Sequence, residues 1–377
     1  MRRSSATMAT RLAVATLIVF AIIPGVGAGV SPSRSSGDSS PVSTERIRKA
    51  VVTLWQDLDR GAPDSLPSRN ARPRCSAFFY HDTHHVLTAQ HCIVGRRDLF
   101  ISTPEGLVLW VTGVVASGEK LDVVELALEP KYSLNRPALH LAPTPAVGSR
   151  VIAFGASQLF QPPSDMRAGR VTNLGSPWLA GPVFATAARS EQGFSGGPVV
   201  DMAGNVVGIT TNVLSPTFDD VNTLPRTAVQ AVSEPAMSAL RHFSPAVDLD
   251  AWNARFARTP WGKFNIAGKC VPDSNSNRDR IRAFRSILQT APHYAEVEMQ
   301  LGMCQMVARD TKAGLAAYER AVRIKPNAEA YYWIAKAYLD LGNTAAANRA
   351  FAKLRSRPAS AIDPAILEAL KRQANGR

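Results

Sequence analysis

Three short segments of the 377-residue chain carry residues that together suit nucleophilic hydrolysis. The first, VLTAQHC, contains His91. The second, LDVVELAL, has Asp122 near the start of an apolar run, and the third, GFSGGP, contains Ser195. A serine hydroxyl is a poor nucleophile at neutral pH unless an imidazole within hydrogen-bond reach accepts its proton. A buried carboxylate can in turn fix the imidazole tautomer and stabilise its charged form.

The chain around these segments predicts β structure. Short runs rich in Val, Ile, Leu and Thr alternate with turn residues, at 51–55, 85–89, 107–115, 123–128, 150–155, 182–187, 197–200 and 205–211. Many short strands with such turns are typical of a sandwich or barrel. No helical pattern separates the strands, as a parallel βαβ sheet would require.

Order and spacing add a family resemblance. The histidine, the aspartate and the serine occur in that order along the chain, and VLTAQHC and GFSGGP are close to the TAAHC and GDSGGP boxes of trypsin-like serine proteases. Residues 46–243 therefore resemble a trypsin-like (chymotrypsin-fold) serine protease domain, which implies an antiparallel double β-barrel. The stretch GFSGGPVVDMAGNVVGIT is similar in layout to bacterial HtrA-type catalytic domains, although no PDZ domain follows it.

The resemblance implies a role for each residue. His91 is expected to act as general base and acid, Asp122 to orient it and Ser195 to attack the substrate. The backbone N–H groups of Gly193 and Ser195 are expected to form the oxyanion hole. Mammalian digestive members have Asp before the nucleophile, where it pairs with a new N-terminus. Phe194 cannot form that ion pair, which argues against activation by N-terminal insertion.

Two other acids and a histidine cluster compete for parts of this site. Asp98 lies only seven residues after His91, and Glu125 lies three residues after Asp122, where strand alternation turns it to the opposite face. His81, His84 and His85 are interpreted as a solvated turn rather than a metal site. No metal or cofactor is expected.

The specificity pocket is expected near Arg189, Thr211 and Val213. The Asp that would favour Lys or Arg at the cleavage position is absent. Arg189 would attract an acidic side chain if it faces the pocket. If it points to solvent, a small or aliphatic preference is expected.

The N-terminus predicts export. Residues 1–28 combine a basic start, the apolar run LAVATLIVFAII and small residues at 26–28, which is the layout of a secretory signal peptide. The alternative is an uncleaved membrane anchor, the one route by which a membrane contact is expected. Residues 29–45 are a Ser/Pro-rich linker. The remainder is thus expected to be periplasmic or secreted.

Disulfides can persist in such a compartment. The resemblance implies a pair between Cys75 and Cys92, with two free buried thiols as the alternative. Whether Cys270 pairs with Cys304 stays open.

The C-terminal quarter predicts helical repeats. Residues 244–275 show little periodicity and are interpreted as a linker, and residues 276–377 are Ala-rich with helical spacing. Marker residues recur there at a nearly constant interval: Phe284, Tyr318 and Phe351, and also Pro292 and Pro326. This period resembles tetratricopeptide (TPR) repeats, with a capping helix at 364–373. The fold class is therefore multidomain β plus α, a double barrel followed by an all-α helical-hairpin domain.

Composition excludes several other classes. With 45% hydrophobic and 19% charged residues, the chain is not disordered throughout. Basic and acidic residues nearly balance over 12–275, whereas basic residues clearly outnumber acidic ones over 276–377. A nucleic-acid function would depend on that last part, which has none of the usual binding motifs, and no nucleic-acid partner is expected.

The sequence as a whole predicts an exported serine endopeptidase acting on proteins or peptides, with a protein partner or substrate on the helical repeats. One alternative is an inactive protease fold that serves as a binding scaffold through its repeats. An esterase is disfavoured because the serine lacks a Gly-x-Ser-x-Gly elbow and the order of the triad residues differs.

Overall fold

The computed structural model describes residues 44–61, 66–130, 135–156, 165–175, 181–214, 226–268, 270, 276–358, 362 and 366. The signal peptide and most of the linker expected at 29–45 lie outside these ranges, as does nearly all of the capping helix expected at 364–373. In the described part, none of the helices has the length and apolar character that a membrane crossing requires.

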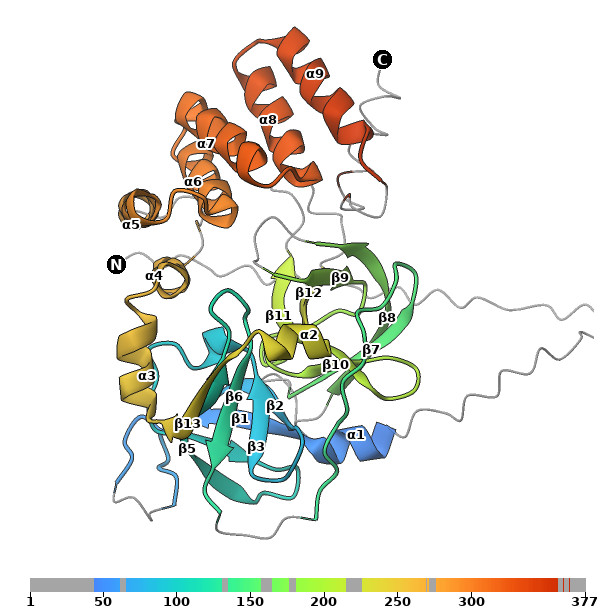
Figure 1. Cartoon of the computed structure of the whole chain (residues 1–377), viewed down its shortest axis with the longest axis vertical. Helices are drawn as coiled ribbons and strands as arrows, with labels where there is room; N and C mark the ends of the chain where they lie inside the picture. The colour runs from blue at the N-terminus through green and yellow to red at the C-terminus, as the bar shows by residue number, and fades with distance from the viewer. Residues whose placement is uncertain are drawn as a thin grey trace, which may run out of the picture. The chain divides into compact units, whose positions relative to one another are not determined.

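Six antiparallel strands form the first β-barrel, after a short helix α1 (Thr44–Ala50) (Figure 1). They are β1 (Val51–Gln56), β2 (Arg72–Phe79), β3 (His85–Thr88), β4 (Leu99–Ser102), β5 (Val108–Ser117) and β6 (Val124–Leu128). The strand order is β5-β4-β1-β2-β3-β6, and β6 pairs back with β5 to close the ring. This barrel carries the candidate histidine and aspartate at strand ends.

The second barrel also has six antiparallel strands, in the closed order β10-β11-β12-β9-β8-β7. They are β7 (Arg150–Gly155), β8 (Asp165–Leu174), β9 (Val183–Thr186), β10 (Pro198–Val200), β11 (Val206–Leu214) and β12 (Arg226–Ala231). Ser195 lies in the loop between β9 and β10. The predicted double β-barrel is therefore confirmed.

The chain then returns to the first barrel. After α2 (Glu234–Ser238), strand β13 (Arg241–Val247) pairs with β5 and joins the first sheet. Two helices follow, α3 (Leu249–Phe256) and α4 (Pro260–Ala267), where the sequence indicated a linker.

These two helices were not predicted from the sequence. Each is only about two turns long, which is too short to show a helical periodicity of apolar residues. Local signals nevertheless define them. Asp248 caps α3 by accepting hydrogen bonds from two backbone N–H groups, and Thr259 caps α4 in the same way with one. Trp252 and Trp261 are each only 2% exposed, so both helices are anchored in the core.

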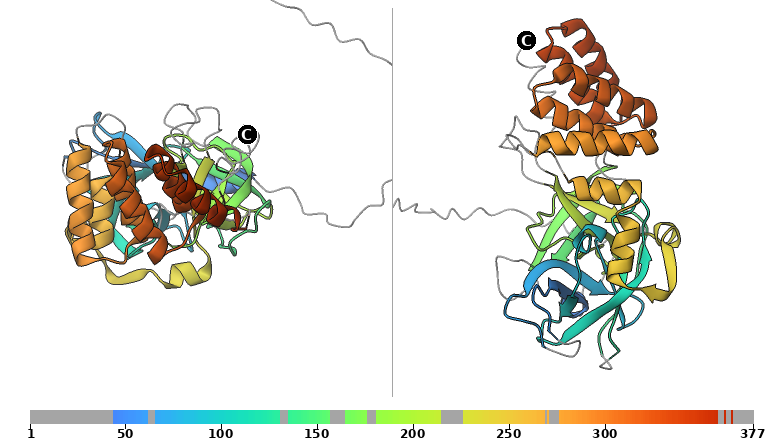
Figure 2. Two further views of the ribbon diagram at one scale, coloured as in Figure 1. Left: turned by 90° about the horizontal axis from the view of Figure 1, so that it is seen from above. Right: turned by 90° about the vertical axis from the view of Figure 1, so that its left-hand side faces the viewer.

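Five helices follow as antiparallel neighbours (Figure 2). They are α5 (Asn277–Thr290), α6 (Ala295–Val307), α7 (Thr311–Ile324), α8 (Ala328–Asp340) and α9 (Thr344–Arg355). The starts of α5, α7 and α9 recur at the interval that the marker residues indicated in the sequence. Gly302 of α6 lies against the ring of Tyr318 of α7, where a Cβ would clash. The helical domain is confirmed, and TPR-like packing stays a prediction.

The apolar core does not stop at the end of the barrels. One cluster of buried side chains runs from the first barrel through α3 and α4 to Phe284, Val297 and Cys304. A separate cluster lies among α6 to α9, and a third fills the second barrel. Helices α3 to α6 thus share the core of the first barrel.

Candidate active site

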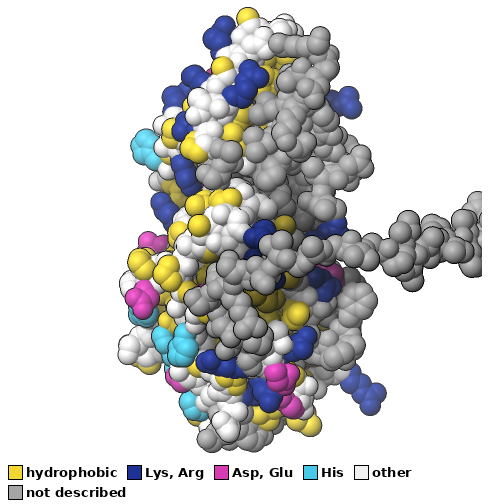
Figure 3. All heavy atoms as spheres, turned by 90° about the vertical axis from the view of Figure 1, so that its right-hand side faces the viewer, with side chains coloured by type: hydrophobic (Ala, Val, Ile, Leu, Met, Phe, Trp, Pro, Cys, Tyr) yellow, Lys and Arg dark blue, Asp and Glu magenta, His cyan; other side chains and the backbone are white. Residues whose placement is uncertain are grey.

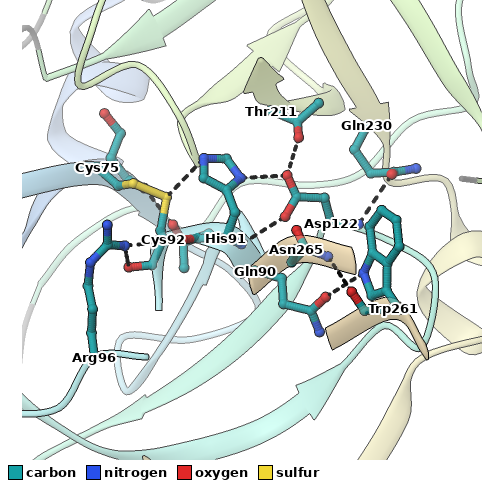
Figure 4. Close-up of polar contacts among 12 residues, drawn as sticks. Cys75, Gln90, His91, Cys92, Arg96, Asp122, Thr211, Gln230, Trp261 and Asn265 are labelled. Carbon is teal, nitrogen blue, oxygen red and sulfur yellow. Dashed lines mark hydrogen bonds and ion pairs between the residues drawn. A yellow bond between two sulfur atoms is a disulfide. The ribbon is translucent and has the colours of Figure 1, made fainter. Parts of the chain in front are cut away.

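The His91 side chain lies at the end of β3, in a short 3₁₀ helix, η1 (Gln90–Cys92). Its Nδ1 is 2.7 Å from Oδ2 of Asp122, and its backbone N–H donates to Oδ1 of the same carboxylate at 2.9 Å (Figure 4). Two hydrogen bonds to one residue fix both the backbone and the ring of His91. This geometry places a proton on Nδ1 and leaves Nε2 as the nitrogen that can accept one.

Asp122 is held from the second barrel. The Thr211 hydroxyl of β11 donates to its carboxylate, and the Asp122 backbone N–H donates to Oε1 of Gln230 of β12 at 3.3 Å (Figure 4). The residue is only 4% exposed. Burial alone would raise the pKa of this carboxyl. The charge of His91 and hydrogen bonds from His91 and Thr211 outweigh burial and lower the pKa below its ordinary value. Asp122 is therefore ionised at neutral pH.

The Ser195 loop packs against the strands that lead to His91. The backbone N–H of Ser76 of β2 donates to the carbonyl of Ser195 at 2.7 Å. Gly196, with a φ of +84°, lies so close to Ser76 and Thr88 that a Cβ would clash with both. Thr88 is three residues before His91, so this close approach brings the loops that carry the serine and the histidine to the same end of β3.

The hydroxyl of Ser195 and the ring of His91 share no hydrogen bond, although both residues are described. The Nε2 of His91 lies 3.8 Å from Sγ of Cys92 instead (Figure 4). The structure thus joins His91 to Asp122 directly and brings the backbone of Ser195 near them. Catalytic hydrogen bonds are often long before substrate binds and tighten in the complex.

The backbone N–H groups of Gly193 and of Ser195 itself are the two expected oxyanion-hole donors. Gly193 has a φ of +105°, which favours glycine, and its carbonyl accepts a 2.7 Å hydrogen bond from the Ser76 hydroxyl. The same hydroxyl accepts from the Ala156 N–H at 2.7 Å, so Ser76 of the first barrel is bonded to two parts of the second, the turn at Gly193 and the residue after β7. Within the described residues, the N–H groups of Gly193 and Ser195 donate to no protein acceptor. Both remain able to bind a negatively charged oxygen.

A disulfide next to His91 also holds the histidine turn in place. Cys75 of β2 and Cys92 of η1 are joined, which ties the residue after His91 to the neighbouring strand. Sulfur atoms of this pair and a ring nitrogen of His91 form one set of potential metal ligands in the described part of the chain. Both sulfurs are bonded to each other, so neither is the thiolate that a metal would need. Cys270 and Cys304 are also joined, which resolves the pairing that the sequence left open.

The competing acids lie elsewhere. Glu125 is buried and makes no hydrogen bond to His91, and burial raises its pKa against the opposing effects of His85 and His242. Asp98 pairs with Arg60 at 3.4 Å. Of the three acids considered, only Asp122 contacts the His91 ring.

The cluster of His81, His84 and His85 is a surface turn organised by Asp82. The Asp82 carboxylate accepts from the backbone N–H groups of His84 and His85 and lies 2.8 Å from Nδ1 of His85. Hydrogen bonding to Asp82 accounts for this cluster.

Phe194 has an apolar role in place of an ion pair. Its side chain is fully buried in the core of the second barrel, directly against Gly155. The Arg167 guanidinium lies 5.9 Å from its ring centroid. Packing of a large aromatic side chain thus holds the loop that carries Ser195.

Of the three expected pocket residues, the structure describes the side chains of Arg189 and Thr211. The side chain of Arg189 is exposed, and the hydroxyl of Thr211 is used by Asp122. The backbone of Val213 pairs with Thr227 in the β11–β12 ladder, and its side chain lies outside the described atoms.

Several residues that support the site were not predicted from the sequence. Trp261 of α4 donates from Nε1 to Oε1 of Gln90 at 2.9 Å (Figure 4). Nε2 of Gln90 donates to the carbonyl of Gly118. Ser76 and Gln230 were missed as well. The sequence did offer a signal for Gln90, because this residue stands where the TAAHC box of trypsin-like proteases has alanine.

Comparison with known families agrees with this architecture. Residues 75–209 match the family described as "Trypsin-like peptidase domain". The chain therefore contains a trypsin-like, chymotrypsin-fold domain of the serine protease type.

Particular relatives cover only part of the chain. It is 25% identical over 214 residues to the "Magnetosome formation protease MamE" of Magnetospirillum gryphiswaldense and to the protein of that name from Paramagnetospirillum magneticum. These matches span 51% of this chain but only 28% and 29% of the relatives. A solved structure, "HtrA-type protease AlgW with decapeptide", is similar with a TM-score of 0.42 and 21% identity, over 51% of this chain and 63% of that chain.

Proposed function

We propose that this protein is an exported serine endopeptidase that hydrolyses peptide bonds of protein substrates. The observation that carries the proposal is the buried, ionised Asp122 bonded to Nδ1 of His91, with Nε2 left to accept a proton. The family match to a peptidase domain and the position of the Ser195 loop support it.

In this mechanism Nε2 of His91 takes the proton of the Ser195 hydroxyl as Oγ attacks the carbonyl carbon of the substrate. The carbonyl oxygen becomes an oxyanion, and the N–H groups of Gly193 and Ser195 stabilise it. The imidazolium then protonates the leaving amine, and water repeats the sequence to release the acid. Asp122 stays ionised throughout and stabilises the imidazolium.

The test is labelling of the purified protein with an organophosphonate, which reacts covalently with activated serines. Wild-type protein should label once, and Ser195→Ala should not label. Ser190→Ala is a matched control, because it removes a hydroxyl from the same loop and should label like wild type. Absence of labelling in wild-type protein would favour the inactive binding scaffold, and equal labelling of Ser195→Ala would identify another nucleophile.

Export belongs to the same proposal. Its support is the basic-then-apolar order of residues 1–23 and the two disulfides, which are typical of oxidising compartments. Fractionation of cells and the mass of the mature N-terminus test it. A cytosolic protein that retains Met1 would contradict it.

The helical region is proposed to bind a protein partner or substrate. Figure 3 shows Lys and Arg side chains scattered over that region, which agrees with the basic excess of residues 276–377. A basic surface favours acidic partners and makes binding sensitive to salt. Cross-linking in the native host, compared with a chain that lacks residues 311–377, tests this part; identical cross-linked products would contradict it.

A further inference from the structure

An ion pair reaches the turn that precedes Ser195. The Nη2 atom of Arg167, on strand β8, lies 2.9 Å from Oε1 of Glu191, and each of the two side chains is 30% exposed. The same guanidinium lies 5.9 Å from the centroid of the Phe194 ring. Arg167 therefore lies beside both ends of the segment 191–194.

Residues 191–194 form a tight turn whose centre carries one of the two expected oxyanion-hole donors. The backbone N–H of Phe194 donates to the carbonyl of Glu191 at 3.1 Å, and Gly193 has a φ of +105°. A positive φ at the third position is typical of a type II turn. The N–H of Gly193 belongs to the central peptide unit, which makes no hydrogen bond within the turn. The direction of this N–H therefore depends on how firmly the two ends of the turn are held.

The downstream end of the turn is held by packing and by the first barrel. The Phe194 side chain is fully buried against Gly155, and the Ser76 hydroxyl donates to the carbonyl of Gly193. These contacts are apolar or uncharged, and they act on the last two residues of the turn.

The upstream end is held by two contacts to other strands. The backbone N–H of Ser190 donates to the Thr227 hydroxyl at 2.9 Å, one residue before the turn begins. Glu191 is the first residue of the turn itself, and its ion pair with Arg167 ties that residue to β8. A partly buried ion pair is screened less by salt than an exposed one. The ion pair therefore supplies a charged support to the end of the turn that the buried Phe194 does not reach.

We propose that Arg167 is a positioning residue of the proposed peptidase, and that its ion pair with Glu191 holds the 191–194 turn so that the Gly193 N–H faces the oxyanion. This inference rests on the proposed function, because the direction of that N–H matters only if Ser195 attacks a carbonyl. Arg167 acts through the turn and is given no contact with the substrate.

The test compares Arg167→Gln, Glu191→Gln and the double variant on a short peptide whose cleavage site is first mapped in an unfolded protein. Arg170→Gln is the matched control, because it removes a guanidinium from the same strand. The Arg170 side chain is exposed and donates to the carbonyl of Gly148 at 2.8 Å, outside the turn.

Removal of one oxyanion-hole donor commonly lowers kcat by about 10²–10³-fold. A donor that is loosened rather than removed should cost less, so each single variant should lower kcat roughly tenfold with little change in KM. The double variant should lose no more than either single variant, because both changes remove the same pair. Arg170→Gln should match wild type. Unchanged kcat in Arg167→Gln would overturn the inference, and so would additive losses in the double variant.

A second measurement separates positioning from general damage to the fold. A peptide aldehyde of the cleaved sequence adds its carbonyl carbon to Oγ of Ser195 and places an oxygen in the oxyanion hole, whereas the peptide amide of that sequence binds without this bond. Arg167→Gln should weaken inhibition by the aldehyde by about the same factor as kcat and leave inhibition by the amide unchanged. Equal weakening of both inhibitors would overturn the positioning role.

Failure of this inference is separable from failure of the proposed function. Wild-type protein that cleaves the short peptide and labels with the organophosphonate supports the peptidase whatever the Arg167 variants show. Wild-type protein that does neither contradicts the peptidase and removes the basis of a positioning role for Arg167.

Discussion

At the scale of single residues, the site depends on how Asp122 is kept charged in a buried position. A carboxylate with 4% exposure is unfavourable unless it receives hydrogen bonds. It receives them from the backbone and ring of His91 on the first barrel and from Thr211 on the second. The ionised acid therefore depends on both barrels at once.

Asp122→Asn tests the orienting role directly. The amide can donate to Nδ1 and so favours the wrong tautomer of His91, which should reduce kcat by about 10⁴-fold with little change in KM. Steady-state kinetics on a short peptide measure this. Glu125→Gln, a similar change to a buried acid three residues away, should leave kcat close to wild type, and a comparable loss there would contradict the assignment of Asp122.

The lowered pKa of Asp122 also predicts how stability depends on pH. A carboxyl whose pKa is lower in the folded than in the unfolded state stabilises the fold above its unfolded value, near 3.8, and loses that contribution as pH falls through the folded pKa. The free energy of unfolding of wild type should therefore fall more steeply in acid than that of Asp122→Asn. Denaturant titrations from about pH 6 down to about pH 3 check this. Parallel curves for the two proteins would contradict it.

At the scale of elements, β2 and β3 together with η1 position the histidine, and three supports hold them. The Cys75–Cys92 disulfide ties η1 to β2, and Ser76 ties β2 to the nucleophile loop. From outside the barrel, α4 reaches Gln90 through Trp261. The third support comes from a part of the chain that the trypsin-like family match, residues 75–209, does not cover.

Trp261→Phe tests the hydrogen bond from Trp261 to Gln90. Phenylalanine keeps an aromatic ring in the core but leaves the buried Oε1 of Gln90 without its donor, a cost of about 1–3 kcal/mol. The Gln90–His91 turn should loosen, so kcat on a short peptide should fall several-fold at unchanged KM. Trp252→Phe is the matched control, because it removes an indole donor to Ser117 instead. It should lower stability and leave kcat unchanged; equal effects of both variants on kcat would contradict a positioning role for Trp261.

Elements with a clear period were predictable from sequence, and contacts between distant segments were not. The short runs rich in Val, Ile, Leu and Thr predicted eight barrel strands and left out β2, β4, β8 and β12. Helices α5 to α9 follow the helical repeat that the recurring aromatic and proline residues marked. His91 and Asp122 meet as the motifs indicated. Thr211 was assigned to a pocket because the direction of its side chain depends on strand register, which the sequence does not show. The contact between Gln90 and Trp261 joins residues 171 positions apart and leaves no local pattern.

At the scale of the whole chain, the buried apolar side chains form separate clusters, and these clusters predict where the protein can be truncated. The core of the first barrel continues through Trp252, Trp261 and Phe284 into α6, whereas α7 to α9 pack mainly in a cluster of their own. The structural unit that contains the double barrel therefore extends well beyond residue 243, where the family resemblance ends.

Two truncations test this boundary. A chain that ends after Arg309 keeps α3 to α6 and should fold and label with the organophosphonate. A chain that ends after Asp248 exposes the apolar surface that those helices cover, and should aggregate or unfold cooperatively at a lower temperature. Solubility, thermal melts and labelling measure the outcome. A stable, labelled chain ending at Asp248 would contradict a shared core.

The contact between Trp261 and Gln90 also bears on the order in which the molecule matures. Trp261 comes well after Ser195 in the chain, so every residue of the candidate triad is synthesised before the indole that holds the histidine turn. A growing chain that already includes Ser195 still lacks the hydrogen bond from Trp261 to Gln90. For the proposed peptidase, we therefore expect full activity only after residue 261 has been synthesised, well after Ser195.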